Sequence, residues 1–397
     1  MKQNKKQVFI IGGGASGLAA AIFAARAGAS VTVLEKEKKP GRKLLRTGNG
    51  RCNLANLGPL EGNYHGLHPE FARFVLKTFS REKLFAFFEE IGIRTRDCGG
   101  WIYPASETAE SVLACLLLAA RELSVRIRTN VCVKTIRKQN GRFLIDVGGY
   151  VYTADRVILS AGSRASLEPS GENEALAIAA AFGHRILPIH PALTALTVED
   201  SKAFGFAGVR IRGKIRLFAD GKLFHEERGQ LQFTEYGISG IPVFNGSSEA
   251  VKALAAGKQV AAEADLFPDM EETLFISYLK ERFERLKERS VQEKLTGLLP
   301  DKMIAAILRE PGSPEQLAAR IRHFPMTVNG FKGMKYAQVM GGGVDTDEID
   351  PATMASKITE GLYICGELLD IDGACGGYNL MFAFAGGAAA GTAQGDY

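Results

Sequence analysis

The chain of 397 residues is long enough for two or three domains of ordinary size. Hydrophobic residues make up 46% and charged residues 23%, which excludes a disordered chain and allows a sizeable buried core. The net charge of +5, from 49 basic and 44 acidic side chains, is too small for a dedicated nucleic-acid-binding protein. We therefore expect a globular protein that acts on a small-molecule substrate and has no nucleic-acid partner.

Predicted strands and helices alternate along the first half of the chain. Residues 8–11, 16–27 and 31–34 predict a β-α-β unit. The elements that follow are helices at 70–92 and 108–123, and strands at 125–127, 131–136, 143–147, 151–153 and 156–160. This order predicts an α/β fold with a Rossmann-like domain, in which a doubly wound, mostly parallel sheet lies between helices.

The pattern changes after Pro188 and Pro191. Residues 209–217 alternate aliphatic with basic side chains, which predicts a strand with one solvent-exposed face. We interpret the basic stripe as that solvated face rather than as an anion site: Arg210, Arg212, Lys214 and Arg216. Residues 275–286 have helical spacing, and strand character returns at 325–328, 336–340 and 362–365 before a last helix that begins near Asn379. These features predict an insertion within the α/β domain.

Two segments resemble export or membrane signals. Lysines precede the apolar run from Val8, but Gly12, Gly13 and Gly14 interrupt that run, so a strand, turn and helix fit better than a signal peptide. Residues 373–395 lack charge but are rich in glycine, so we expect a helix buried against a sheet and no membrane span. The cysteines have no C-x-x-C spacing, which favours a reducing, cytoplasmic compartment: Cys52, Cys98, Cys115, Cys132, Cys365 and Cys375.

The first motif, Gly12-x-Gly14-x-x-Gly17, follows a predicted strand and opens a predicted helix. Gly12 permits a tight turn, Gly14 allows a pyrophosphate to approach the backbone, and Gly17 allows close packing of helix on strand. Glu35 ends the next strand, where its carboxylate can accept hydrogen bonds from ribose hydroxyls and would repel a 2′-phosphate. Together these features predict a dinucleotide-binding site.

The second motif spans residues 41–53, directly after the acidic strand end. Arg42 and Lys43 are candidates to neutralise a pyrophosphate, and the small residues at 47–50 would let backbone N–H groups reach a flat ring. The alternative is a solvated basic loop. Cys52 has no second cysteine at redox-disulfide spacing, so we expect a small residue packed near the ring.

The third motif follows the strand at 362–365 and begins with Gly366-Glu367. A carboxylate there suits the ribitol hydroxyls of FAD, a group that NAD lacks. Asp372 and the run 376–380 then open a helix, whose N-terminus stabilises the negative charge of a reduced flavin. The alternative is simple helix capping by Asp372 or Asn379. Non-covalent FAD is the cofactor that these three motifs favour.

These motifs resemble the HI0933-like, or BaiN-like, family of flavoproteins, often described as NAD(FAD)-utilising dehydrogenases, with bile-acid reductase-like and aminoacetone oxidase-like members. The most specific stretches are 50–53 and 376–379. The resemblance implies an FAD-binding domain (1–188 with 346–397), an inserted β-barrel-like domain (189–247 with 322–345) and a helical subdomain (248–321).

The resemblance also implies which residues line FAD, with Val131 acting through its backbone near adenine. They are Gly12, Gly14, Ala15, Ser16, Gly17, Glu35, Lys36, Arg42, Lys43, Thr47, Arg51, Cys52, Asn53, Val131, Gly162, Gly366, Glu367, Asp372, Asn379 and Leu380. This chain departs from the family pattern at Asn49, where glycine is more common, and in the expected substrate pocket at Glu235, Ile241 and Met340-Gly341.

The expected function is an FAD-dependent oxidoreductase that transfers hydride between a small organic substrate and flavin, with NAD(P)H as one candidate donor. A second G-x-G-x-x-G is missing, so NAD(P)H would bind without its own Rossmann domain. An oxidase that uses O2 and a non-catalytic flavin module are the alternatives. Tyr378, Glu235 and Tyr236 are candidate substrate contacts, no catalytic base is assigned, and His65 and His68 lack further ligands, so no metal is expected.

Overall fold

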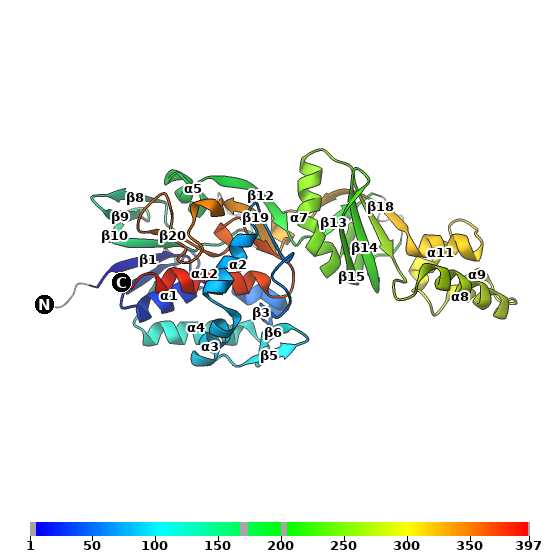
Figure 1. The fold of residues 1–397 in the computed structure, drawn as a ribbon, viewed down its shortest axis with the longest axis horizontal. Helices are drawn as coiled ribbons and strands as arrows, with labels where there is room; N and C mark the ends of the chain where they lie inside the picture. The colour runs from blue at the N-terminus through cyan, green and yellow to red at the C-terminus, as the bar shows by residue number, and fades with distance from the viewer. Residues whose placement is uncertain (1–4, 167–173, 200–204, 396–397) are drawn as a thin grey trace. The chain divides into compact units, whose positions relative to one another are not determined.

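The computed structural model describes residues 5–166, 174–199 and 205–395. The chain divides into two compact units, Met1–Ile189 with Val339–Tyr397, and His190–Gln338. We call them the Rossmann unit and the barrel unit; Figure 1 labels many of their elements.

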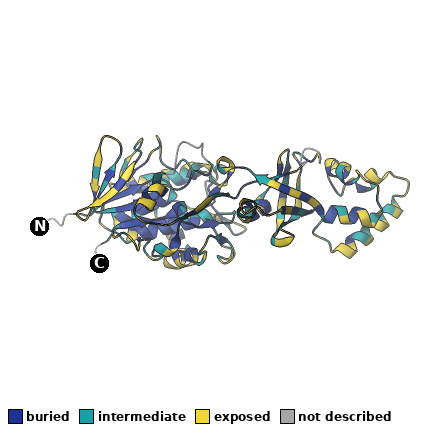
Figure 2. Cartoon of the chain, turned by 90° about the horizontal axis from the view of Figure 1, so that it is seen from above, coloured by how far each residue is buried: buried dark blue, intermediate teal, exposed yellow. Residues whose placement is uncertain are grey.

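A five-stranded parallel sheet forms the centre of the Rossmann unit. Its strand order is β20-β11-β1-β2-β7, and every neighbouring pair is parallel. The strands are β1 (Gln7–Ile11), β2 (Ser30–Leu34), β7 (Arg126–Arg128), β11 (Arg156–Leu159) and β20 (Leu362–Ile364). Strands β1, β2, β11 and β20 are almost entirely buried (Figure 2), as uninterrupted aliphatic runs require in a parallel sheet. The predicted α/β, Rossmann-like fold is confirmed.

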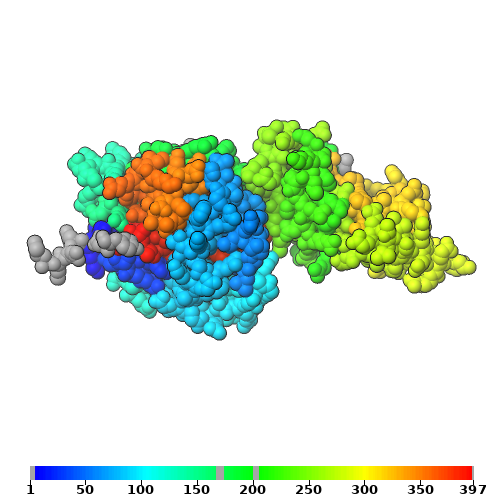
Figure 3. Space-filling view, in the orientation of Figure 1, coloured from blue at the N-terminus to red at the C-terminus, as the bar shows by residue number. Residues whose placement is uncertain are grey.

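Helix α12 (Tyr378–Thr392) packs tightly on α1 (Ala15–Arg26) through glycines. A Cβ atom at Gly387 would lie 2.2 Å from the backbone oxygen of Ser16, and one at Gly391 would lie 2.5 Å from that of Ala20. Only glycine permits this backbone approach. The uncharged C-terminal segment is thus a buried helix, as predicted, although it packs chiefly on α1 and not on a sheet; little of it (red) reaches the surface in Figure 3. Among the described residues, no helix has the length and apolar character to cross a bilayer.

Smaller sheets and helices complete the Rossmann unit. The sheets are β10-β9-β8, β3-β6-β5, β12-β19 and β21-β4. Their strands are β3 (Ala55–Asn56), β4 (Tyr64–His65), β5 (Thr95–Cys98), β6 (Trp101–Pro104), β8 (Thr135–Gln139), β9 (Arg142–Asp146), β10 (Val151–Ala154), β12 (Ile186–Ala192), β19 (Val339–Val344) and β21 (Asp372–Gly373). The helices are α2 (Glu70–Thr78), α3 (Arg81–Glu90), α4 (Ala109–Glu122) and α5 (Glu174–Ala181).

A closed six-stranded barrel, in the order β13-β16-β15-β14-β17-β18, forms the barrel unit together with five helices of the described residues 190–199 and 205–338. The strands are β13 (Leu196–Val198), β14 (Arg210–Ala219), β15 (Lys222–Thr234), β16 (Gly237–Ser239), β17 (Val260–Asp265) and β18 (Phe324–Phe331). The helices are α7 (Ile241–Ala255), α8 (Glu272–Arg285), α9 (Val291–Leu295), α10 (Asp301–Ile307) and α11 (Pro314–Arg322). Inward-facing barrel residues and the helices share one apolar core. The predicted barrel-like insertion is confirmed.

Several predicted elements were wrong in detail. The helix expected at 70–92 is two helices, because the chain turns at Phe79 and Ser80 caps α3 by accepting a hydrogen bond from the Lys83 N–H. The strand expected at 131–136 begins only at Thr135, because Asn130 and Val131 instead donate their backbone N–H groups to the Glu37 and Glu35 oxygens. Strand β19 lies at Val339–Val344 instead of 336–340. Strand β17 falls within the range expected to be helical, because it closes the barrel between β14 and β18.

Candidate functional site

The residues implied to line FAD follow the carboxyl ends of the five parallel strands. Across the sheet, residues 366–372 follow β20, Gly162 follows β11, Gly12–Gly17 follow β1, Glu35 follows β2 and Val131 follows β7. Five strands at about 4.8 Å spacing span about 19 Å. Carboxyl edges of parallel sheets are where such folds bind ligands, and this edge matches an elongated one.

Each glycine of the β1–α1 turn has the environment that its predicted role requires. A Cβ atom on Gly12 would lie 2.6 Å from the Ala161 Cα, and one on Gly17 would lie 2.0 Å from the Gly12 oxygen. A Cβ on Gly14, by contrast, would meet no atom within 4 Å among the described residues. The free space at Gly14 lies at the N-terminus of α1, where unbonded N–H groups can bind a phosphate.

Glu35 is held in place by backbone donors. Its Oε2 accepts a 2.7 Å hydrogen bond from the Gly13 N–H, and its Oε1 accepts a 2.8 Å bond from the Glu37 N–H. The side chain is buried at the end of β2. We call residues 12–17 with Glu35 the nucleotide end of the site.

The loop after β2 winds through the left-handed region. Gly48, Asn49 and Gly50 have φ values of 56°, 54° and 83°, and Cys52 has 60°. Asparagine tolerates this conformation better than most side chains, which explains why Asn49 can stand where glycine is more common in the family. The loop then enters β3, and its Asn53 lies against the start of α12.

Lys43 and Glu367, which lie 324 residues apart in the chain, are directly paired. The Lys43 Nζ lies 2.5 Å from the Glu367 Oε2 and donates a 3.1 Å hydrogen bond to the Ser163 hydroxyl. Glu367 Oε1 also accepts a 2.9 Å bond from the Met340 N–H. The two sequence motifs therefore meet, and in the structure Lys43 neutralises the carboxylate expected at the ribitol.

The start of α12 offers donors and unsatisfied acceptors. Gly377, at φ 102°, precedes the helix, and a Cβ there would lie 2.5 Å from the Ala55 oxygen. The Asn379 side chain accepts a 2.8 Å hydrogen bond from the Gly373 N–H and donates a 2.6 Å bond to the Gly373 oxygen. The backbone N–H of Asn379 itself lies at the helix N-terminus, where it can serve as a donor. Residues 47–53 and 365–373 and the start of α12 form what we call the redox end.

Two buried oxygens at the redox end have no hydrogen-bond partner in the described part of the chain, Asn53 Oδ1 and Asp372 Oδ2. The His65 Nδ1 lies 3.5 Å from Asp372 Oδ2, beyond good hydrogen-bond geometry. Buried polar atoms normally have partners, so both oxygens are places where a ligand can supply a donor. These atoms, the space at Gly14 and the two uncapped helix N-termini fit FAD.

Two thiols at the redox end are unreactive in character. Burial raises the pKa of Cys52 to about 12, opposed by a hydrogen bond from Thr47. Burial raises the pKa of Cys365 to about 12 as well, opposed by a hydrogen bond with Ser16. All six cysteines are free, so Cys52 is a small packed residue, as predicted.

The remaining predicted residues lie around the same edge but have protein partners. Arg42 pairs with Glu37 at 2.8 Å, and Lys36 lies 3.8 Å from Glu174. Arg51 lies over the Tyr103 ring, 4.6 Å from its centroid. The Val131 N–H donates to the Glu35 backbone oxygen, so its carbonyl is the group that can contact adenine.

Sequence reasoning missed several residues that position the site. Ser163, the Met340 backbone, His65 and Asn56 all contact predicted residues or their loops; Asn56 donates a 2.8 Å bond to the Gly376 oxygen. Ser163 follows Gly162 directly, so the strand-end pattern could have indicated it.

A further cluster, His68 with Asp345 and Asp347, was also not anticipated. The His68 Nε2 lies 3.1 Å from Asp347 Oδ2, and Asp345 pairs with Arg185.

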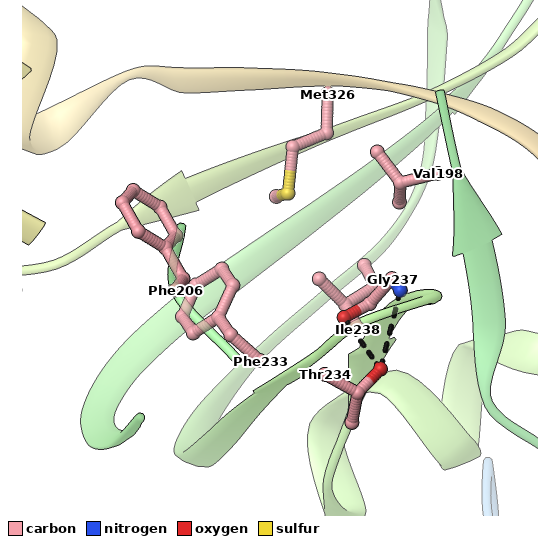
Figure 4. Close-up of a pocket in the computed structure, with 7 residues that line it drawn as sticks. All are labelled: Val198, Phe206, Phe233, Thr234, Gly237, Ile238 and Met326. Atoms are coloured by element: carbon pink, nitrogen blue, oxygen red, sulfur yellow. Dashed lines mark hydrogen bonds between the residues drawn. The ribbon is translucent and has the colours of Figure 1, made fainter. Parts of the chain in front are cut away.

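In the barrel unit, a small apolar pocket opens beside the β15–β16 turn (Figure 4). The Thr234 hydroxyl closes this turn by accepting from the Gly237 N–H at 3.1 Å and donating to the Gly237 oxygen at 3.0 Å. The candidate substrate contacts Glu235 and Tyr236 form the tip of the same turn and are exposed. The lining residues are Val198, Phe206, Phe233, Thr234, Gly237, Ile238 and Met326.

The fold and this site define an FAD-dependent oxidoreductase built on a Rossmann-like FAD-binding domain. The family model described as HI0933-like protein Rossmann domain matches residues 6–393. The chain belongs to this family.

Three similar proteins illustrate the family and the fold. A 3-dehydro-bile acid delta(4,6)-reductase of Clostridium scindens is 39% identical over 98% of both chains. A ribosomal RNA dihydrouridine synthase of Haemophilus influenzae is 30% identical over 94% of this chain and 95% of its own. A 3-ketosteroid-delta4-(5alpha)-dehydrogenase from Rhodococcus jostii RHA1 has a similar structure, with a TM-score of 0.50 and 15% identity over 100% of this chain and 98% of its own, which shows the fold alone.

Proposed function

We propose that this protein reduces a carbon–carbon double bond conjugated to a carbonyl group, using FAD as the hydride carrier and NAD(P)H as the electron donor. The observation that supports it most is the pair of full-length relatives, which act on different molecules by the same chemistry. A delta(4,6)-reductase of a 3-keto bile acid saturates a dienone, and a dihydrouridine synthase saturates the C5–C6 bond next to the C4 carbonyl of uracil. The balanced reaction consumes NAD(P)H and one proton and yields NAD(P)+ and the saturated carbonyl compound.

The residues implied to bind FAD support a hydride carrier at the redox end. Bound FAD would accept and donate the hydride at its ring system. The N–H groups of Asn379 and Leu380 at the start of α12 would stabilise negative charge on the ring edge. Asp372 and Asn53 would accept hydrogen bonds with oxygens that now have no partner in the described chain, while Lys43 holds Glu367 in position.

NAD(P)H fits this scheme as a transient donor. The sequence has one G-x-G-x-x-G, and FAD is implied to occupy it, so the nicotinamide cofactor would bind, react and leave before the substrate enters. All six cysteines are free thiols, which supports a reducing cytoplasm as the place of this reaction.

The substrate has two candidate classes. The C. scindens relative is the more similar in sequence and favours a small polycyclic enone, which falls within the small organic substrates that the sequence predicted. Two dihydrouridine synthases, of H. influenzae and Escherichia coli, match 94% of this chain and favour a uracil ring in RNA. A uracil in RNA is contrary to the expectation, drawn from the net charge, that the protein has no nucleic-acid partner. The surface of the barrel unit described in the next subsection supports this substrate class.

An anaerobic donor and substrate screen tests the proposal. We expect NADH or NADPH to bleach the flavin absorbance near 450 nm, and a steroidal 4,6-dien-3-one or a uridine-containing RNA to restore it. Hydrogen peroxide formed in air with an amine, and no bleaching by either nucleotide, would instead indicate an oxidase. A flavin that no donor bleaches would indicate a binding module. The Gly14→Ala variant is the matched control, because it should lose FAD with little change elsewhere.

A further inference from the structure

The outer face of the β14–β15 ladder is divided into a neutralised half and a basic half. In the neutralised half, Arg216 lies 2.7 Å from Glu226 and 2.5 Å from Glu263, and Lys214 lies 3.3 Å from Glu226. These contacts hold the pKa of Glu226 below its usual range, chiefly through the hydrogen bond from Arg216. The charges in this half cancel, as on an ordinary solvated strand.

The basic half has no such compensation. Arg210 pairs in register with Gln232, Arg212 with Gln230, and Lys214 with Arg228. Alternate residues of a strand share a face, so Arg210, Arg212 and Arg228 lie together with the two glutamines, opposite the buried Leu231 and Phe233. All three arginines are exposed, and none has a carboxylate within 4 Å among the residues that the structure describes. We call this surface the arginine face.

Two exposed tyrosines lie at the same end of the barrel. Tyr236 follows β15 two residues after Thr234, near the end at which β14 begins. The Lys332 ammonium lies 4.4 Å from the ring centroid of Tyr236 and 4.6 Å from that of Tyr336. The two residues are 38% and 60% exposed, so each still offers area to a stacking partner.

We propose that the arginine face and the Tyr236–Lys332–Tyr336 cluster bind single-stranded RNA. Guanidinium groups suit phosphodiester oxygens, glutamine amides suit bases and riboses, and exposed aromatic rings stack on unpaired bases. The inference rests on the second substrate class proposed above, and it assigns to the barrel unit the role of holding the RNA that presents a uracil. Glu235 beside Tyr236 is the one acidic neighbour in this turn, so we expect binding to be led by the arginines.

Fluorescence anisotropy of a labelled oligouridylate of about 12 nucleotides, titrated with the full-length FAD-loaded protein, tests this binding. Each phosphate contact releases counterions from a single strand, so three contacts correspond to a slope of about −2 in a plot of log affinity against log salt concentration. At 0.15 M salt this slope amounts to about 50-fold in affinity. The triple variant R210Q/R212Q/R228Q should therefore bind about 50-fold more weakly, with a salt dependence that is shallower by about 2.

The matched control is R285Q/K287Q/R289Q, which removes the same charge from exposed positions of the same unit. It should retain wild-type affinity to within about twofold. The double variant Y236A/Y336A should lose about tenfold or more, with an unchanged salt slope, because stacking is not an ionic contact.

Equal losses in the triple variant and its control would overturn the proposal, as would a wild-type protein that does not bind the oligonucleotide. A failure of the proposed reaction can be told apart from a failure of RNA binding. The anisotropy measurement needs no turnover, and bleaching of the flavin by NAD(P)H and its reoxidation by a dienone need no RNA. The triple variant should keep its FAD and its dienone reoxidation rate, so loss of RNA binding alone would be attributed to the arginine face.

Discussion

The nucleotide end and the redox end of the proposed FAD site are built in different ways. At the nucleotide end, one β-α-β unit supplies everything, and Glu35 already accepts two hydrogen bonds from its neighbours' backbone. At the redox end, segments more than 300 residues apart meet, and two buried oxygens still have no partner among the described residues. The comparison teaches that the protein itself holds the carboxylate of the first end in place, whereas it leaves two acceptors of the second end for a ligand to satisfy.

Replacing single glycines at the nucleotide end should give the largest effects. A Cβ in Gly17→Ala would lie 2.0 Å from the Gly12 oxygen, so we expect a loss of about 3 kcal/mol or more in the free energy of unfolding, with or without FAD. Gly14→Ala meets open space and should leave the apoprotein unchanged within about 0.5 kcal/mol while greatly weakening FAD binding. Thermal melts of the apoproteins and the flavin content of the purified proteins measure these two effects. Equal stabilities of the Gly17→Ala and Gly14→Ala apoproteins would contradict the roles assigned to these glycines.

High pH should loosen the redox end through its buried thiols. Cys52 and Cys365 keep their protons when folded, with pKa values of about 12, whereas the thiols of the unfolded chain ionise with a pKa near 9.0. Stability present below pH 9 should therefore be lost as the pH rises toward 12. At pH 10 the loss should be about 1.4 kcal/mol for each thiol, or about 3 kcal/mol together.

Denaturant melts between pH 8 and pH 10.5 measure this loss. Cys52→Ala should remove about half of the pH dependence, and the exposed Cys98→Ala should change nothing. A pH dependence identical in all three proteins would show that these thiols do not limit stability.

Breaking the Lys43–Glu367 pair should have an intermediate effect. The two side chains are 25% and 17% exposed, so Lys43→Met leaves a largely buried carboxylate without its cation. We expect a loss of about 2 kcal/mol, with Glu367→Gln in the Lys43→Met background recovering part of it. The half-exposed pair Lys280–Glu315 is the control, where Lys280→Met should cost much less, because solvent screens both charges. Additive losses in the double variant would refute the pairing.

The smallest effect should come from Asp372→Asn. The buried Oδ2 has no partner among the described residues, so the apoprotein should be as stable as wild type or more stable by up to about 1 kcal/mol. FAD should bind about tenfold more weakly if Asp372 accepts a hydrogen bond from it. Flavin fluorescence titration of the apoprotein measures this affinity; unchanged binding would place Asp372 outside the site.

Elements with a local pattern were predictable, and those that depend on distant contacts were less so. The apolar runs of β1, β2 and β11 and the spacing of three glycines identified the Rossmann unit and its nucleotide end. The break at Phe79 escaped prediction because the apolar stripe continues on both sides of it. Strand β17 escaped because its role is to close the barrel against strands 40 or more residues away.

The sequence by itself determined the fold class and the dinucleotide motif, because glycine positions and hydrophobic periodicity act over neighbouring residues. It also predicted that two distant stretches converge on one cofactor. Only the tertiary structure decided that Lys43 pairs with Glu367, that Asp372 lies beside His65, and that half of the basic stripe is neutralised while half is not. Charge pairing and burial depend on which side chains meet across strands and helices, and linear spacing does not contain that information.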